Sequence, residues 1–280
     1  MGLPRLLAEL TDRIIDFCYD DKWTLSNCAL ANSSWLPASR LHLFYTIISS
    51  GEKGTDRAVQ LTSIIGDKTI AVLQRWPSIL PYIKIVKIVS QCPDQLENAA
   101  SLAHAIRTFC DSEGLPSPSV HISLIQFKTG PKILSTQLSL INDIVTHVKL
   151  HNVTFVYADE IWPFLSSLPR LQHLEIPGFR FSTPTRYSLP PERMFDGIPL
   201  STLRVSTMFQ GIVILSLTNV AGSMSHLEDF GIVYEGVWQK DLPQLAEAIQ
   251  KMVKMSEVFR ELLSGCRKGQ RIAASRIRYQ

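Results

Sequence analysis

Histidines are the residues of this sequence whose spacing comes nearest to that of a reactive site. His147 and His151 lie four residues apart, but they flank an expected strand, so metal-ligand spacing on a helix does not apply to them. His147 and His173 occupy the same outward position in two successive repeats, which predicts side chains about 5 Å apart on neighbouring strands, with His121 as a further candidate neighbour. A zinc site needs a third and a fourth ligand, and no cysteine or carboxylate pattern supplies them. We therefore expect surface histidines, no metal and no cofactor.

Other reactive constellations are missing from the sequence as well. Asp20 and Asp21, like Asp159 and Glu160, are adjacent and fit helix starts better than an acid–base pair. There is no Gly-rich phosphate loop, no nucleophile elbow and no H-E-x-x-H motif. The five tryptophans are dispersed and offer no stacking array for single-stranded nucleic acid. The sequence predicts a protein that is not an enzyme; the alternative needs a deep pocket with converging polar groups.

Composition narrows the class of protein. The 280 residues are 45% apolar and 19% charged, which is typical of a globular chain. A net charge of +3 gives no argument for nucleic acid or membrane as a partner. Five cysteines without a C-x-x-C pair indicate reduced thiols. Arg5, Glu9 and Asp12 precede any long apolar run, and no run suits a bilayer, so we expect a cytoplasmic or nuclear protein.

The first 48 residues differ from the rest of the chain in their residue pattern, which predicts three short helices. The first helix has apolar residues at helical spacing, namely Leu6, Leu10, Ile14 and Phe17, widened by Leu7 and Ile15. Asp20 and Asp21 can cap the second helix, whose apolar side carries Leu25, Cys28 and Ala29. Ser33 or Ser34 can cap the third, which tolerates Pro37 in its first turn and carries Trp35, Leu36, Leu41 and Phe44.

Three helices of this size cannot cover all of their own large apolar groups. The unit therefore either docks on the rest of its chain, as an N-terminal cap, or exposes a patch to a partner.

Three stretches of this segment resemble an F-box, and more narrowly that of the large F-box families of mushroom-forming fungi. The stretches are LLAELTDRIIDF (6–17), TLSNCAL (24–30) and SWLPASR (34–40), followed by Leu43 and Phe44. One departure is that Leu7 stands where the family usually has proline, and Pro4 lies three residues earlier.

This resemblance implies binding to the small SKP-type adaptor and, through it, to the cullin of a cullin–RING ubiquitin ligase. The residues that it assigns to the adaptor surface are Leu6, Leu7, Glu9, Leu10, Ile14, Leu25, Ala29, Trp35 and Leu36. We expect about half of them to contact the adaptor and the others to form the helical core.

A repeated apolar pattern follows a connector over residues 49–76, whose expected helix runs through Ala58, Leu61, Ile64 and Ile65. The pattern reads Leu80-Ile83-Ile85, Val145-Val148-Leu150, Leu171-Leu174-Ile176, Leu200-Leu203-Val205 and Leu227-Phe230-Ile232, with a weaker copy at Val120 and Ile122. The later copies are 26 to 29 residues apart, within the range of leucine-rich repeats. Residues 161–168 suit a short helix on the outer side of the strands.

The predicted fold is α/β: an F-box of three helices at 1–48, the connector at 49–76, and an irregular leucine-rich-repeat-like solenoid at 77–240. Irregularity is expected because Val153, Phe179, Met208 and Glu235 replace the usual asparagine or cysteine. An amphipathic helix over Asp241–Ser264 and a basic tail from Arg267 would close the chain at 241–280. An ordinary α/β domain with similar strand spacing is the alternative.

Outward positions of the repeat strands predict a surface that reads a target protein. These positions hold Tyr82, Lys84, His147, Lys149, His173, Glu175, Thr202, Arg204 and Asp229, and they could equally be the solvated side of a sheet. The sequence thus predicts a non-catalytic substrate-recognition adaptor of an SKP–cullin–F-box ubiquitin ligase. The alternative is a repeat scaffold or interaction protein without a ubiquitin role.

Overall fold

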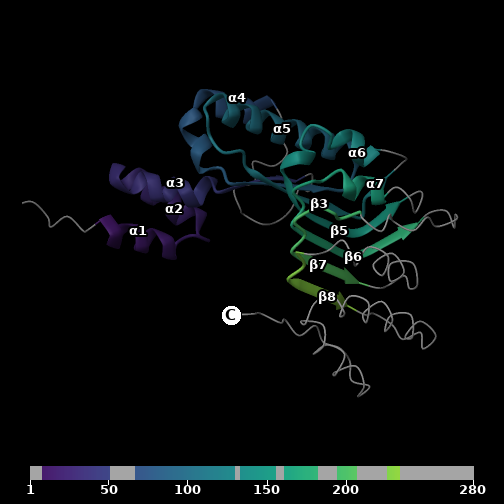
Figure 1. Ribbon diagram of the computed structural model, residues 1–280. Helices are drawn as coiled ribbons and strands as arrows, with labels where there is room; N and C mark the ends of the chain where they lie inside the picture. Colours follow the sequence, from purple (N-terminus) through teal and green to yellow (C-terminus); the bar gives the residue numbers. More distant parts are fainter. Residues whose placement is uncertain are drawn as a thin grey trace, which may run out of the picture. The chain divides into compact units, whose positions relative to one another are not determined.

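Figure 1 shows the computed structural model, which describes residues 8–50, 67–129, 133–155, 161–181, 194–206 and 226–233. The chain has two compact units, the first formed by Met1–Val89 with Glu97–His121 and the second by Ser90–Leu96 with Ile122–Gln280. Both helices and strands are present, and the predicted α/β class is confirmed. None of the helices described here is long and apolar enough to cross a bilayer.

Several predicted features lie outside the described residues. They are Leu6, Leu7, the helix through Ala58 to Ile65, Asp159, Glu160, Met208, Glu235, the helix over Asp241–Ser264 and the tail from Arg267.

The N-terminal helices of the first unit are α1 (Ala8–Phe17), α2 (Lys22–Ala31) and α3 (Leu36–Phe44), with a 3-10 turn η1 (Ser33–Trp35) before α3. We call residues 8–44 the trihelix. Asp21 caps α2 as predicted, since its Oδ1 accepts hydrogen bonds from the backbone N–H groups of Trp23 (3.1 Å) and Thr24 (3.0 Å). The predicted cap at Ser33 or Ser34 is wrong: Asn32 Oδ1 accepts from Ser34 N–H and starts η1 instead.

The rest of the first unit joins short strands and helices. Its elements are β1 (Thr46–Ser50), α4 (Asp67–Arg75), the 3-10 helix η2 (Pro77–Tyr82), β2 (Ile85–Ser90) up to Val89, α5 (Pro93–Ser112) from Glu97 onward, and the start of β3 (Ser119–Ile125). The strand order is β1-β2-β3, and β1 runs parallel to β2 with Thr46 opposite Ile85.

The first strand of the apolar pattern begins later in the chain than the sequence predicted. Leu80 and Tyr82 lie in η2, and the strand begins only at Ile85. Pro77 and Pro81 explain the difference, because proline fixes φ near −65° and has no N–H to donate to a strand ladder. β1 was also not predicted, although Ile47 and Ser49 alternate as buried residues along it.

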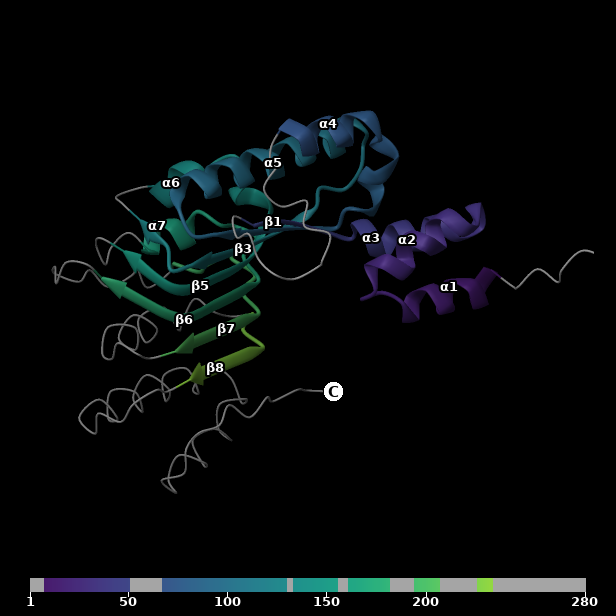
Figure 2. The same cartoon turned by 180° about the vertical axis from the view of Figure 1, so that it is seen from behind.

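The second unit is built on parallel strands, which run side by side in Figures 1 and 2. It contains β4 (Lys128–Thr129), α6 (Ile133–Gln137), η3 (Asn142–Ile144), β5 (Val145–Phe155), α7 (Ile161–Ser166), β6 (His173–Phe181), β7 (Thr202–Ser206) and β8 (Asp229–Val233). The strand order is β3-β5-β6-β7-β8 with β4 beside β5. The pairs β4–β5, β5–β6, β6–β7 and β7–β8 are all parallel.

The register of these strands follows the apolar repeat of the sequence. Val148 pairs with Leu174, Leu174 with Leu203, and Leu203 with Phe230. These four residues are the equivalent positions of the repeat, so the predicted side-by-side alignment is confirmed. The helix expected at 161–168 is also present as α7, and it buries Ile161, Phe164 and Leu165.

A left-handed residue interrupts β5. Asn152 has φ +54°, and the register against β6 shifts on both sides of His151. The irregularity adds one residue between Leu150 and Val153. Val148 and Leu150 before it and Val153 and Phe155 after it are therefore buried on the same face of the sheet. Gln126, which donates its backbone N–H to His151 O (2.8 Å), has φ +52° at the corresponding point after β3.

Candidate interaction surfaces

Helix α1 carries apolar residues on two different faces. Leu10, Ile14 and Phe17 follow one another at intervals of four and three residues, so they form one stripe along the helix. This stripe is open to solvent, with exposed fractions of 49% for Leu10, 47% for Ile14 and 85% for Phe17. Thr11 and Ile15, also four residues apart, are buried and face the inside of the trihelix.

Helix α2 shows the same division. Leu25 is completely buried, and Cys28 and Ala29 beside it are half-buried, as the predicted apolar side requires. Trp23 and Leu30, seven residues apart and roughly opposite Leu25 around the helix, are 77% and 86% exposed. The second apolar face was not predicted, although the seven-residue spacing was a signal for it.

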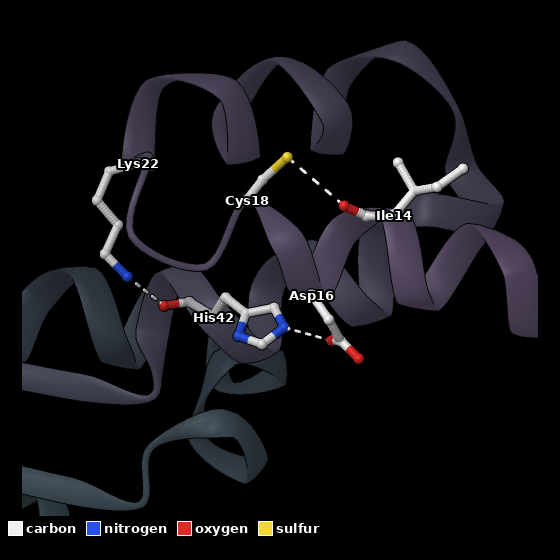
Figure 3. Close-up of polar contacts among 5 residues, drawn as sticks. All are labelled: Ile14, Asp16, Cys18, Lys22 and His42. Atoms are coloured by element: carbon white, nitrogen blue, oxygen red, sulfur yellow. Dashed lines mark hydrogen bonds and ion pairs between the residues drawn. The ribbon is translucent and has the colours of Figure 1, made fainter.

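Polar contacts hold the trihelix together through α3 (Figure 3). His42 Nε2 on α3 lies 2.7 Å from Asp16 Oδ1 on α1. Lys22 Nζ, at the start of α2, donates to the backbone carbonyl of His42 at 2.5 Å. Burial lowers the pKa of the Lys22 ammonium group. Helix α3 is therefore bonded to both of its neighbours, and the exposed stripes of α1 and α2 are left out of these bonds.

The residues predicted for adaptor binding differ in how far they are exposed. Glu9, Leu10 and Ile14 are exposed, and Ala29, Trp35 and Leu36 are half-buried. Leu25 has no exposed surface and belongs to the internal core, so it is removed from the candidate surface. Leu6 and Leu7 lie outside the described residues. Exposed apolar residues that the prediction missed are Phe17, Trp23, Leu30 and Leu41.

The second candidate surface is the outward face of strands β5–β8. His147 pairs in register with His173, and their rings stack with centroids 4.0 Å apart and planes inclined by 24°. The predicted side-by-side arrangement of these two residues is confirmed. Thr146 Oγ1 and His147 Nδ1 lie 2.8 Å apart, so one imidazole nitrogen of the pair is engaged at the strand itself.

Beside the imidazoles lies a charge ladder, which consists of Lys149, Glu175, Arg204 and Asp229. Lys149 Nζ is 2.8 Å from Glu175 Oε2, and Arg204 reaches Glu175 Oε1 at 3.5 Å with one nitrogen and Asp229 Oδ2 at 2.8 Å with the other. Arg204 reaches diagonally because its direct cross-strand partner is Gly231. The four residues therefore form a continuous series of ion pairs of alternating charge, with Lys149, Glu175 and Arg204 in register and Asp229 two residues before the position opposite Arg204 on β8.

Electrostatics on this face favour the neutral form of His173 and the charged form of Arg204. Burial lowers the pKa of His173, and the Arg204 charge lowers it further, against the opposing effect of Asp229 and Glu175. The hydrogen bond to Asp229 raises the pKa of Arg204. The two cations and two anions of the charge ladder cancel.

Two of the predicted target-binding residues do not lie on this face. Tyr82 ends η2, and Lys84 stands between η2 and β2, so neither occupies a repeat strand. The backbone of Lys84 forms two hydrogen bonds: its N–H donates to Tyr45 O, and its carbonyl accepts from Ser119 N–H. The remaining predicted residues, including Thr202, lie on β5, β6, β7 and β8.

A shallow hollow of about 450 Å³ adjoins the amino ends of β6, β7 and β8. It is lined by Gln172, Pro199, Ser201, His226, Leu227 and Glu228. Hydrogen bonds along this edge join backbones, with the Gln172 carbonyl accepting from the N–H groups of Ser201 and Thr202. Across the described ranges, no three His, Cys, Asp or Glu side chains gather as they would around a metal ion.

No protein-family model matches the chain. No curated protein matches it at a significant level.

Proposed function

We propose that this chain is a substrate-recognition subunit of an SKP–cullin–F-box ubiquitin ligase. In this proposal the trihelix is an F-box that binds an SKP-type adaptor, and the second unit is a leucine-rich-repeat-like domain that binds a target protein. The chain performs no chemistry itself. It raises the effective concentration of the target beside the ubiquitin-transfer machinery.

The observation that supports this proposal best is the apolar surface of the trihelix. Ten large apolar side chains are exposed among the described residues, and seven of them lie in the trihelix, from Leu10 to Leu41. Isolated exposed apolar residues are common, but a concentration of them on one small helical unit marks an interaction site. An adaptor interface of standard size buries about 1,200–2,000 Å² in total.

The test is binding of the purified full-length chain to a purified SKP-type adaptor, measured by calorimetry. Leu10→Asp with Ile14→Asp places two charges in the exposed stripe of α1 and should weaken binding by at least about a hundredfold, as loss of a central apolar anchor does. Leu140→Asp is the matched control, because Leu140 is 50% exposed but lies outside the trihelix. A wild-type chain that is folded by circular dichroism and does not bind the adaptor contradicts the proposal.

A second candidate function is a scaffold whose N-terminal helices only cap the chain. Helix α3 contacts η2 and β1 of the same unit, as the helices of such a cap would, and this contact favours the scaffold. Deletion up to Phe44 separates the two functions and leaves β1 intact. The remainder should stay soluble if the trihelix is a docking module and should aggregate if it is a cap.

A further inference from the structure

The outward face of β5, β6 and β7 presents two parallel rows of side chains. Lys149, Glu175 and Arg204 are in register across the three strands and form a row of positive, negative and positive charge. His147, His173 and Thr202 are also in register, two residues earlier on each strand, and Asp229 on β8 continues this second row. Asp229 on β8 extends the alternation through its bond to Arg204.

We propose that this face binds an α-helix of a partner protein that lies across the strands. The helix carries an acidic residue, a basic residue three positions later and a second acidic residue four positions after that. The proposal rests on the proposed function only in taking the second unit as the part that binds a target.

The spacing of the charged row selects a helix. Neighbouring strands lie about 4.8 Å apart, so Glu175 and Arg204 stand about 4.8 and 9.6 Å from Lys149 along the row. A helix rises 1.5 Å per residue, so the residues three and seven positions after a given residue lie about 4.5 and 10.5 Å from it along the axis and on the same face. Same-face residues of an extended peptide are about 6.7 Å apart, and the second step already misses Arg204 by about 4 Å.

The alternation of charge selects the pattern of the partner. Lys149 and Arg204 are 48% and 46% exposed and Glu175 is 33% exposed, so each keeps open surface beyond its internal ion pair. A partner with opposite alternation is attracted at every position, whereas a uniformly charged partner is repelled at every second one. This feature argues against nucleic acid, whose phosphates would face Glu175 and Asp229.

The imidazole row provides the second half of the contact. It lies about 6.6 Å along the strands from the charged row, within the roughly 10 Å width of a helix. The stacked rings of His147 and His173 lie in this row, where they can contact an aromatic or aliphatic side chain on the flank of the bound helix.

The test selects binders to the full chain from two displayed libraries, one of stable single helices and one of short flexible peptides. We expect enrichment of helices with the acidic-x-x-basic-x-x-x-acidic pattern. The control is a charge-inverted chain with Lys149→Glu, Glu175→Lys, Arg204→Glu and Asp229→Lys, which keeps the alternation and thus the internal ion pairs. Selected helices should bind it at least about tenfold more weakly, and helices with every charge reversed should bind it instead.

Enrichment of flexible peptides over helices, equal binding to the inverted chain, or no enrichment from either library would overturn the proposal. The variant Leu10→Asp with Ile14→Asp should bind the selected helices as the wild type does. Loss of adaptor binding and loss of helix binding are therefore separate results, and each contradicts only its own proposal.

Discussion

The imidazole rings of His147 and His173 stack with their centroids 4.0 Å apart, on neighbouring parallel strands. Two protonated rings at this distance would repel one another, and burial together with Arg204 already lowers the pKa of His173. The folded chain therefore binds a proton at His173 less readily than the unfolded chain does.

This depressed pKa makes stability depend on pH. The contribution of His173 to the free energy of unfolding is fully present above the ordinary histidine pKa of about 6.5, and it is lost as pH falls below that value. We expect urea unfolding to show a lower free energy of unfolding at pH 5.5 than at pH 7.5. His173→Gln should lose less stability over the same interval, and an equal loss in both proteins would refute the assignment.

Glu175 is the central residue of the charge ladder, since it pairs with both Lys149 and Arg204. Glu175→Gln leaves two cations without their shared anion, and we expect it to lower the free energy of unfolding by roughly 0.5–1 kcal/mol. Glu113→Gln, at an exposed position after α5, should change it by less than half as much. Urea titrations in low and high salt provide the check, and the difference between the variants should shrink at 1 M salt.

Leu10 and Leu25 test the division of the trihelix into surface and core. Leu25 has no exposed area, so Leu25→Ala should cost about 3 kcal/mol through lost burial and a cavity. Leu10 is 49% exposed, and Leu10→Ala should cost less than about 1 kcal/mol. Thermal and chemical unfolding measure both values. Equal costs for the two variants would show that the stripe of α1 is covered in solution.

The strand register was the part of the fold that the sequence predicted best. Val148, Leu174, Leu203 and Phe230 repeat at nearly constant intervals, and a constant repeat forces neighbouring strands to align at the same position. The stacked histidines follow directly from that register. The resemblance to an F-box and to leucine-rich repeats stays a prediction.

Two features of the fold could not be predicted from apolar spacing alone. The apolar residues before β2 match the repeat pattern, but the prolines of η2 prevent a strand there, so the placement of Tyr82 and Lys84 on a repeat strand was wrong. Apolar periodicity also could not tell which stripe of α1 or α2 turns inward. Leu10 and Ile15 are equally suited to a core, and only the packing of three helices decides between them.

Gly114 ends α5 in a conformation that other residues adopt at a cost. Its φ is +65°, its N–H donates to Asp111 O at 3.2 Å, and Leu115 N–H donates to Cys110 O at 2.8 Å, the two bonds of a Schellman motif. A Cβ at this position would meet no atom within 4 Å, so Gly114→Ala isolates the backbone cost from any clash. We expect a loss of about 1–2 kcal/mol in the free energy of unfolding, measured by urea titration. Ser101→Ala, at an exposed position within the same helix, should be neutral or slightly stabilising, because alanine is the better helix former. A Gly114→Ala protein as stable as the wild type would mean that the helix end relaxes into another turn.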